Sequence, residues 1–377
     1  MLVWEKPNVT PACRVAIAGD FHPAGGLQLP AGKSWKDLAN GLRRRFAKAD
    51  VTLLNLECCV NVGDSAAETK LGPGDTFAAE PEVLEFLSFP GRNIAGLANN
   101  HSCDYGEEGI ARTKEALAKR GLVALGIGRT LQEPPEVCVM ETHGAVRVGI
   151  WAAARHLPEL ASYKRAGVEP ATRRRAEAAL RALREEGADF NLAFLHAGLE
   201  RTNRPDPDDV ELMDQFACLG FDVVAASHSH RISGYRRIDR SSGRPAFCFY
   251  GLGSITSGVL YSEMEREGLI VLVDIGSSGE IAHVEVHPVY LEDSGWGRIP
   301  LFGDAHRILQ RFVDLSEELE TGTYRQSFYR DLKGDFSRSL FRNLQVAMQR
   351  GGARGLARKL GRIRMRHLNR LLQSGLG

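Results

Sequence analysis

Polar side chains of the kinds that bind metals recur directly after the predicted β-strands, and this pattern constrains the fold more than any other feature of the sequence. They fall in five short segments: GDFH at 19–22, NLE at 55–57, NNHSCDYG at 99–106, HAGLE at 196–200 and HSH at 228–230. In open α/β sheets, ligand sites lie beyond the carboxyl ends of the strands. The pattern therefore predicts an α/β protein with one polar site at the sheet edge.

Short apolar runs alternate with longer amphipathic ones, which predicts helices flanking a sheet or a sheet sandwich. Strands are expected at 14–19, 51–56, 93–98, 122–125, 137–142, 146–153, 189–196, 222–226, 246–250, 268–274 and 280–287. Helices are expected at 35–49, 81–87, 104–120, 171–186 and 208–219. Ser34 is predicted to cap the first helix, and Asp104 with Glu107 to form a capping box at the third.

Composition narrows the class of protein without identifying a partner. The 377 residues carry a formal net charge of +1, so no overall field favours an acidic or a basic partner, and no specific nucleic-acid motif is visible. The seven cysteines are odd in number and lack CxxC spacing, which indicates reduced thiols. No signal peptide and no apolar run of the ~18 residues that a spanning helix needs are visible, so a cytoplasmic location is expected.

The candidate ligands predict a site for two metal ions. In an extended segment, side chains two residues apart point to one side, so Asp20-x-His22 and His228-x-His230 each present two ligand groups together. The full set is Asp20, His22, Glu57, Asn100, His101, His196, His228 and His230. Eight groups are too many for one tetrahedral ion. They suit two ions of higher coordination number that share a carboxylate, about 3.5–4 Å apart.

Each residue also has an ordinary structural interpretation when it is taken alone. Asp20 could cap a turn, Glu57 could belong to an ion pair, and Asn99 or Asn100 could occupy a left-handed turn. The joint pattern favours the metal site, because five of the eleven histidines fall in the five segments. The other six show no such pattern.

The five segments resemble the CapA family of poly-γ-glutamate capsule-synthesis proteins, whose domain is similar to calcineurin-like metallophosphoesterases. The resemblance covers roughly residues 13–290, and NNHSCDYG matches the family pattern NNHxxDxG. It implies a four-layer α/β/β/α sandwich at 13–290. Charge and helical spacing predict a basic helical C-terminal extension at 300–377. Three segments depart from the family pattern: HAGLER at 196–201 replaces HWGxEY, ASHSH at 226–230 replaces GHHPH, and YGLGSI at 250–255 replaces YSLGNF.

The resemblance also implies a role for each residue of the site. Asp20, His22 and His230 would hold one divalent ion, Asn100, His196 and His228 would hold the second, and Glu57 would bridge them. His101 would touch the reacting oxygen, and Asp104 would orient His101 or cap the helix. The ions would be Mn, Fe, Zn or Co.

Three functions are compatible with this site. The first is a metallophosphoesterase-like hydrolase that activates a bridging water against a phosphoester or related anionic substrate, with Arg155, Arg201 or Arg204 as candidate anion-binding groups. The second is a peptide-tailoring enzyme that hydrolyses, transfers or epimerises at a peptide or polyglutamyl carboxylate. The third is an assembly subunit without catalysis, against which a non-ligand histidine such as His101 argues.

The C-terminal segment 336–377 carries ten Lys or Arg residues and no acidic residue. Leu356, Leu360, Ile363, Leu368 and Leu371 share one face at helical spacing. Such a helix could pack its apolar stripe on the main domain, or it could dock on an anionic partner or membrane surface.

Overall fold

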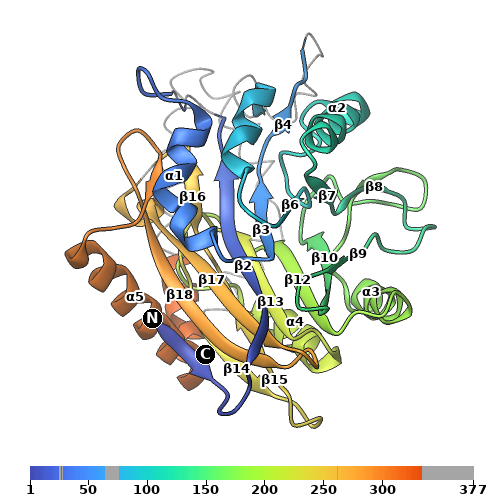
Figure 1. Cartoon of the computed structure of the whole chain (residues 1–377), viewed down its shortest axis with the longest axis vertical. Coiled ribbons are helices and arrows are strands. Elements are labelled where there is room, and N and C mark those ends of the chain that lie inside the picture. The colour runs from blue at the N-terminus through green and yellow to red at the C-terminus, as the bar shows by residue number, and fades with distance from the viewer. Residues whose placement is uncertain (25–26, 28, 64–75, 261, 333–377) are drawn as a thin grey trace, which may run out of the picture. The chain divides into compact units, whose positions relative to one another are not determined.

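The computed structural model describes residues 1–377 except 25–26, 28, 64–75, 261 and 333–377 (Figure 1). A first compact unit comprises Met1–Glu317, and a second unit begins at Glu318. All the assigned strands and the candidate site lie in the first unit. No helix among the described residues has both the length and the apolar character of a membrane span.

The larger sheet has nine strands, in the order β1-β18-β17-β2-β3-β6-β7, with β16 beside β2 and β19 beside β18. Its strands are β1 (Leu2–Glu5), β2 (Pro11–His22), β3 (Val51–Leu56), β6 (Arg92–Gly96), β7 (Val123–Leu125), β16 (Ser254–Ser257), β17 (Glu267–Gly276), β18 (Ile281–Leu291) and β19 (Gly297–Arg298). Strands β2, β3, β6 and β7 are parallel, so their carboxyl ends lie at one edge.

The smaller sheet has six strands, in the order β14-β15-β13-β12-β10-β9. They are β9 (Cys138–Glu141), β10 (Arg147–Ala154), β12 (Phe190–Ala197), β13 (Val223–His228), β14 (Tyr235–Asp239) and β15 (Pro245–Phe249). The central four, β10, β12, β13 and β15, are parallel. The parallel strands form the centre of the smaller sheet, whereas in the larger sheet they form one side, from β2 to the edge strand β7. Short pairs β4 (Cys59–Val60) with β5 (Ala78–Ala79) and β8 (Ile127–Arg129) with β11 (Gly167–Val168) complete the strands.

The two sheets pack face to face, and helices cover their outer faces (Figure 1). The helices are α1 (Trp35–Phe46), η1 (Pro81–Leu87), α2 (Gly106–Lys119), α3 (Arg173–Glu185) and α4 (Pro207–Leu219). Between the sheets, a Cβ added to Gly96 of β6 would lie 3.1 Å from the ring of Phe194 on β12. Outside the smaller sheet, Trp151 of β10 stacks on Phe221 and contacts Phe216 of α4. The expected four-layer α/β/β/α sandwich is confirmed.

Most expected elements are present, but the third helix begins differently. Helix α1 has the predicted Ser34 cap, with a reciprocal hydrogen bond to Asp37. Helix α2 begins at Gly106 after Tyr105, which makes no side-chain cap. The predicted capping box of Asp104 with Glu107 is therefore wrong, because the Asp104 carboxylate is taken by other partners, the His101 ring and the Phe77 amide. The segment at 81–87 is a 3-10 helix.

After β19 of the larger sheet the chain continues into α5 (Phe302–Thr321). Within the first unit, Arg307 and Arg311 of this helix form ion pairs with the buried Glu267 of β17. The division expected at 290–300 remains a prediction. The predicted terminal helix with its basic and apolar faces, in 336–377, lies outside the described residues.

Gly19 allows β2 to approach the loop before β16 closely, and it provides a test of the fold. A Cβ at Gly19 would overlap the carbonyl oxygen of Gly253, which accepts the amide of Asp20 at 2.9 Å. We therefore expect Gly19→Ala to lower the free energy of unfolding by about 1–3 kcal/mol. Denaturant unfolding would measure the change.

Gly303→Ala is the matched control, because Gly303 lies in the first turn of α5 with no atom within 4 Å of the added Cβ. Alanine favours a helix over glycine, so the control should be neutral or slightly stabilising. Equal stability of the two variants would contradict the close approach at Gly19.

Candidate metal centre

The candidate ligands gather at the carboxyl ends of strands from both sheets. Asp20 and His22 end β2, Glu57 follows β3, His196 lies near the end of β12, and His228 ends β13. Two clusters of ligand type form there, each with donor atoms within 4.8 Å of one another: Asp20, Glu57 and His230, and Glu57, His196 and His228. Because Glu57 belongs to both clusters, it lies where a bridging ligand would be needed.

Asp20 is fully buried and is held by several donors. Its Oδ1 accepts a hydrogen bond from Asn55 Nδ2 at 2.8 Å, and its Oδ2 lies 3.1 Å from His230 Nδ1. Burial by itself would raise the pKa of Asp20, but the hydrogen bond and positive charge of His230 outweigh it and lower the pKa well below its usual range. Asp20 is therefore an ionised carboxylate in the interior.

His230 shows the reciprocal effect. Burial opposes its charged form, but the negative charge of Glu57 and the hydrogen bond from His230 to Asp20 raise its pKa to about 10. In this arrangement the imidazolium fills the place of a cation beside the two carboxylates. A metal ion bound there would take over that charge compensation, and His230 would then be neutral, as a ligand must be.

Glu57 is the second buried carboxylate. Its Oε1 lies 3.7 Å from His196 Nε2, and its Oε2 lies 3.8 Å from His230 Nδ1. Burial first, and the nearby negative charge of Asp20 second, raise the pKa of Glu57 well above its usual range. Two carboxylates this close resist simultaneous ionisation unless cations lie between them.

The second cluster brings an amide and two imidazoles together. His196 Nε2 lies 2.7 Å from Asn100 Oδ1, so both atoms face the same space. The ring of His228 lies 4.2 Å from that of His196, centroid to centroid. Burial, followed by the mutual repulsion of these two rings, lowers the pKa of His196 well below its usual range. Burial lowers the pKa of His228 as well, so both rings favour the neutral form that a metal ligand requires.

His22 lies beside the first cluster without belonging to it. Its ring centroid is 6.2 Å from that of His230 and 6.1 Å from that of His101. Burial, together with the positive charges of those two histidines, lowers the pKa of His22 to about 3. Its assignment to the first ion remains a prediction.

His101 and Asp104 form a pair at the rim of the site. His101 Nδ1 lies 2.8 Å from the buried Asp104 Oδ2, and that oxygen also accepts the amide of Phe77 at 2.8 Å. The Phe77 ring stands edge-on to His101 at 4.5 Å. Two roles were expected for Asp104. Its carboxylate contacts the His101 ring and does not cap helix α2. His101 Nε2 takes no part in the pairing with Asp104.

Two asparagines, Asn55 and Asn99, support the candidate ligands through hydrogen bonds, a role that the sequence did not predict for them. Asn99 is buried, donates to Asn55 Oδ1 at 2.9 Å and to the Leu56 carbonyl at 2.8 Å, and accepts the His101 amide at 3.0 Å. Asn55 in turn donates to Asp20. The signal available in the sequence was position, since Asn55 precedes Glu57 by two residues on the same strand end and Asn99 adjoins Asn100.

The backbone of the His-x-His segment is strained. His228 has φ 116° and His230 has φ 54°, a region that favours glycine. The His228 amide lies 3.3 Å from Asp20 Oδ2, which helps to hold this conformation. Strain of this kind concentrates at functional sites.

Arg155 follows β10 beside this edge, and its Nε is paired with the buried Asp209 at 2.8 Å. This ion pair limits its use for a substrate anion. The Arg201 amide donates to the Ser229 carbonyl at 2.8 Å, so the 198–205 segment adjoins the His-x-His segment. The anion-binding roles of Arg155, Arg201 and Arg204 stay predictions.

The donor set fits divalent metal ions. Among the described residues, three buried atoms at the site have no hydrogen-bond partner: His22 Nε2, Glu57 Oε1 and His228 Nδ1. Unpaired buried polar atoms are costly, and a cation would satisfy them. Mixed imidazole, carboxylate and amide donors suit Mn, Fe, Zn or Co. The residues present therefore fit the expected cofactor class.

The fold and the paired ligand clusters define an α/β/β/α protein with a candidate metal centre. The family described as bacterial capsule synthesis protein PGA_cap matches residues 14–258, more than half of the chain, and the chain belongs to that family. The resemblance to CapA proteins is thereby confirmed.

Two named relatives are distant from this chain in sequence. A probable polyglutamine synthesis accessory protein of Mycobacterium tuberculosis is 26% identical over 257 residues, which cover 64% of this chain and 66% of that protein. The capsule biosynthesis protein CapA of Bacillus anthracis is 23% identical over 205 residues, which cover 53% of this chain and 48% of CapA. The chain thus spans about half to two thirds of these relatives.

Two solved structures resemble the chain in part. The calcineurin-like phosphoesterase YfkN from Bacillus subtilis has a TM-score of 0.44 and 13% identity, covering 81% of this chain and 98% of that one. NAD nucleotidase of Haemophilus influenzae has a TM-score of 0.44 and 12% identity, covering 79% of this chain and 55% of that one. At these scores the likeness is partial, and membership of the family rests on the sequence match.

A substitution of Glu57 tests whether this carboxylate serves both ligand clusters. We expect the purified chain to bind two divalent ions and Glu57→Ala to lose both, because one carboxylate serves both clusters. Elemental analysis after buffer exchange would count the ions. Glu115→Ala, which removes an exposed glutamate of α2, is the control and should keep both. A Glu57→Ala protein with two tightly held ions would refute the bridging role.

Proposed function

We propose that this chain is a dinuclear metal-dependent hydrolase of the metallophosphoesterase type, acting on a phosphoester or related anionic substrate. One observation carries the proposal: two ligand clusters share the buried Glu57, and a histidine outside both clusters is oriented by its own carboxylate. A site with a purely structural metal needs no such histidine.

The cofactor would be held by the two clusters. Asp20, Glu57 and His230 would bind one ion, with His22 beside them, and Asn100, His196 and His228 would bind the other with Glu57. Bound at this site, two divalent ions would lower the pKa of water and neutralise anionic oxygens of the substrate. The buried Asn55 would keep Asp20 oriented through its 2.8 Å hydrogen bond.

His101 would act as the proton donor. Its Nδ1 is engaged by Asp104, which selects the tautomer and leaves Nε2 as the atom that can hold the mobile proton. The Phe77 amide and Asp104 together restrain the ring, so Nε2 keeps one direction. A proton on Nε2 could then pass to the leaving oxygen as its bond to the substrate breaks.

A second candidate is a peptide-tailoring enzyme. It is favoured by the names of two relatives, which refer to polyglutamine synthesis and to capsule biosynthesis. In that case the same site would bind a peptide or polyglutamyl carboxylate, and hydrolysis, transfer or epimerisation would occur at the adjoining residue. An assembly subunit that holds metals without turnover is the third.

A matched panel of chromogenic substrates separates these functions. We expect the metal-loaded chain to hydrolyse bis(p-nitrophenyl) phosphate or p-nitrophenyl phosphate, and not γ-glutamyl-p-nitroanilide. Release of p-nitrophenol or p-nitroaniline would be followed after reconstitution with each of Mn, Fe, Zn and Co, with Glu57→Ala as the background. Turnover of the anilide alone would favour the peptide enzyme. Two bound ions without any turnover would favour the assembly subunit.

His101→Ala tests the proton donor. A general acid contributes about 10²–10⁴-fold, so we expect turnover to fall within that range while both ions stay bound. The control is His143→Ala, because the His143 side chain is 96% exposed and pairs only weakly with Asp50 at 3.3 Å. Loss of metal from His101→Ala would make His101 a ligand, and unchanged turnover would remove it from the mechanism.

A further inference from the structure

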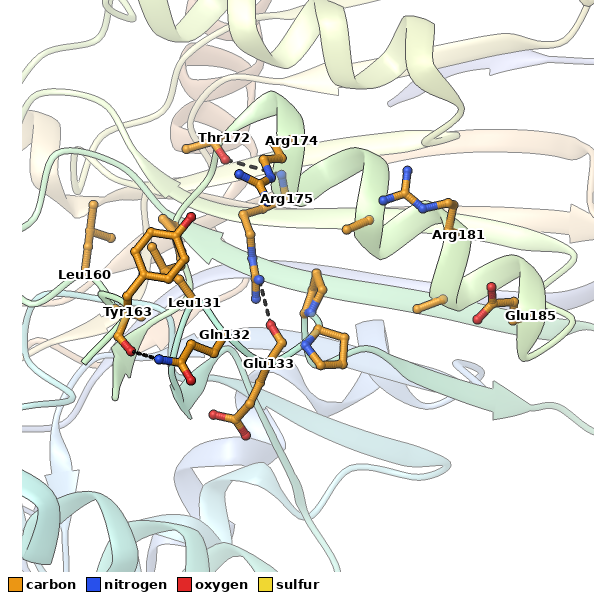
Figure 2. A pocket seen from close by; sticks show the side chains of 16 residues that line it. Leu131, Gln132, Glu133, Leu160, Tyr163, Thr172, Arg174, Arg175, Arg181 and Glu185 are labelled. Carbon is orange, nitrogen blue, oxygen red and sulfur yellow. Dashed lines mark hydrogen bonds between the residues drawn. The ribbon is translucent and has the colours of Figure 1, made fainter. Parts of the chain in front are cut away.

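A cavity of about 540 Å³ lies along α3, away from the metal centre (Figure 2). Its walls are α3, the segment 131–135 and the segment 160–163. None of the candidate metal ligands lines it. Its volume falls within the range of sites that bind small molecules.

The walls of the cavity are fixed by buried contacts. The buried Arg175 donates to both carboxylate oxygens of Glu169, at 2.6 and 2.7 Å, and its third contact reaches the Glu133 carbonyl at 2.8 Å. Gln132 donates to the Tyr163 carbonyl at 2.8 Å and so joins the other two walls. Pro134 and Pro135 stiffen the segment between them. The cavity is therefore preformed.

Two guanidinium groups in the cavity remain available to a ligand. Arg174 and Arg181 line it and form no hydrogen bond or ion pair through their side chains with any described residue. Arg173 on the same helix, by contrast, is paired with Glu177 at 2.9 Å and lies outside the cavity. Arg175 is neutralised by Glu169. Two carboxylates also line the cavity (Figure 2). Glu133 Oε2 already accepts hydrogen bonds from the Thr130 amide and hydroxyl, at 2.8 and 3.0 Å, and Glu185 lies at the far end, beyond Arg181.

The remaining surface of the cavity is apolar. Leu131, Leu160 and Ala178 line it beside the two prolines, and the Tyr163 ring is 56% exposed at its end. A large exposed ring beside apolar walls offers a face for an aromatic or other flat group. Arg174 and Arg181 are seven residues apart, which is about 10 Å along a helix.

We propose that this cavity binds a small organic anion with an aromatic or apolar body. The body lies on Tyr163, Leu160 and the prolines, and the anionic group meets Arg174 and Arg181. Guanidinium groups suit carboxylate, sulfonate and phosphate oxygens, because they present paired donors in one plane. This ligand site is distinct from the metal centre and does not depend on the hydrolase proposal.

The probe for the test is 8-anilinonaphthalene-1-sulfonate, whose fluorescence rises in an apolar environment. N-phenyl-1-naphthylamine, the same aromatic body without the sulfonate, is its uncharged match. We expect the full, metal-loaded chain to bind the sulfonate at one saturable site, and at least about tenfold more tightly than the amine, as expected for a charge-assisted contact. Absence of saturable binding up to about 1 mM sulfonate would overturn the proposal.

Paired variants locate the site. The double variant Arg174→Gln with Arg181→Gln should weaken sulfonate binding about tenfold or more and leave the amine unchanged. The control double variant Arg173→Gln with Arg184→Gln removes the same charge from α3 outside the cavity, and should bind as the parent does. If both double variants bind the sulfonate equally weakly, the overall charge of α3 explains the loss of binding, and the proposed site is refuted.

Ala178→Phe provides a second measurement, because a phenyl group there would occupy part of the cavity. We expect it to weaken binding of both probes while thermal unfolding and metal content stay at parental values. Full probe binding by a folded Ala178→Phe protein would refute this location. If that variant unfolds, the two arginine double variants, which change exposed side chains only, still decide the outcome.

Discussion

The burial of two carboxylates side by side is the constraint on which the site depends. Asp20 and Glu57 are both enclosed, and each is costly to bury as an anion unless positive charge lies beside it. His230 supplies part of that positive charge, and the two carboxylates beside it raise its pKa in turn. Glu57 remains under-compensated, which is why burial and Asp20 raise its pKa. Two divalent cations would resolve this imbalance, so the same electrostatics that make the arrangement unfavourable without metal favour its loading.

The architecture supplies what this arrangement needs, because two sheets contribute to one edge. Asp20 and Glu57 come from the larger sheet, whereas His196 and His228 come from the smaller one. The larger sheet also carries His22, and the smaller sheet adds the two imidazoles of the second cluster. The buried asparagines restrain this geometry through hydrogen bonds. Asn99 accepts the His101 amide and donates to Asn55 and to the Leu56 carbonyl at the end of β3, and Asn55 donates to Asp20. A site built in this way can be rigid without a bound substrate.

The elements that the sequence predicted well were those with long, regular patterns. Helix α1 and the parallel strands followed from hydrophobic periodicity and from the Ser34 cap, and the polar segments after strands pointed to one edge. The edge strand Tyr235–Asp239 and the short, polar β16 were not predicted, because tertiary pairing creates them and local composition does not. Asp104 was ambiguous for a physical reason: an aspartate three residues before a glutamate can cap a helix, but here the nearby His101 and Phe77 amide are the partners. The Asn55–Asn99 relay could not be predicted, since it depends on side chains from separate strands meeting in the interior.

The cavity along α3 and the candidate metal centre share one structural support, although none of the candidate metal ligands lines the cavity. Glu169 binds the Arg175 guanidinium in the cavity wall through its carboxylate, and its carbonyl accepts the Ala154 amide at 2.8 Å. Ala154 ends β10 directly opposite His196 on β12. A rigid salt bridge thus holds α3 and the end of β10 in register with the strand that carries a candidate ligand. Buried, bidentate ion pairs are costly to break by removing one partner. The Arg175–Glu169 pair therefore acts first as scaffold, and for that reason neither residue is a suitable place to test ligand binding, whereas the exposed Arg174 and Arg181 are.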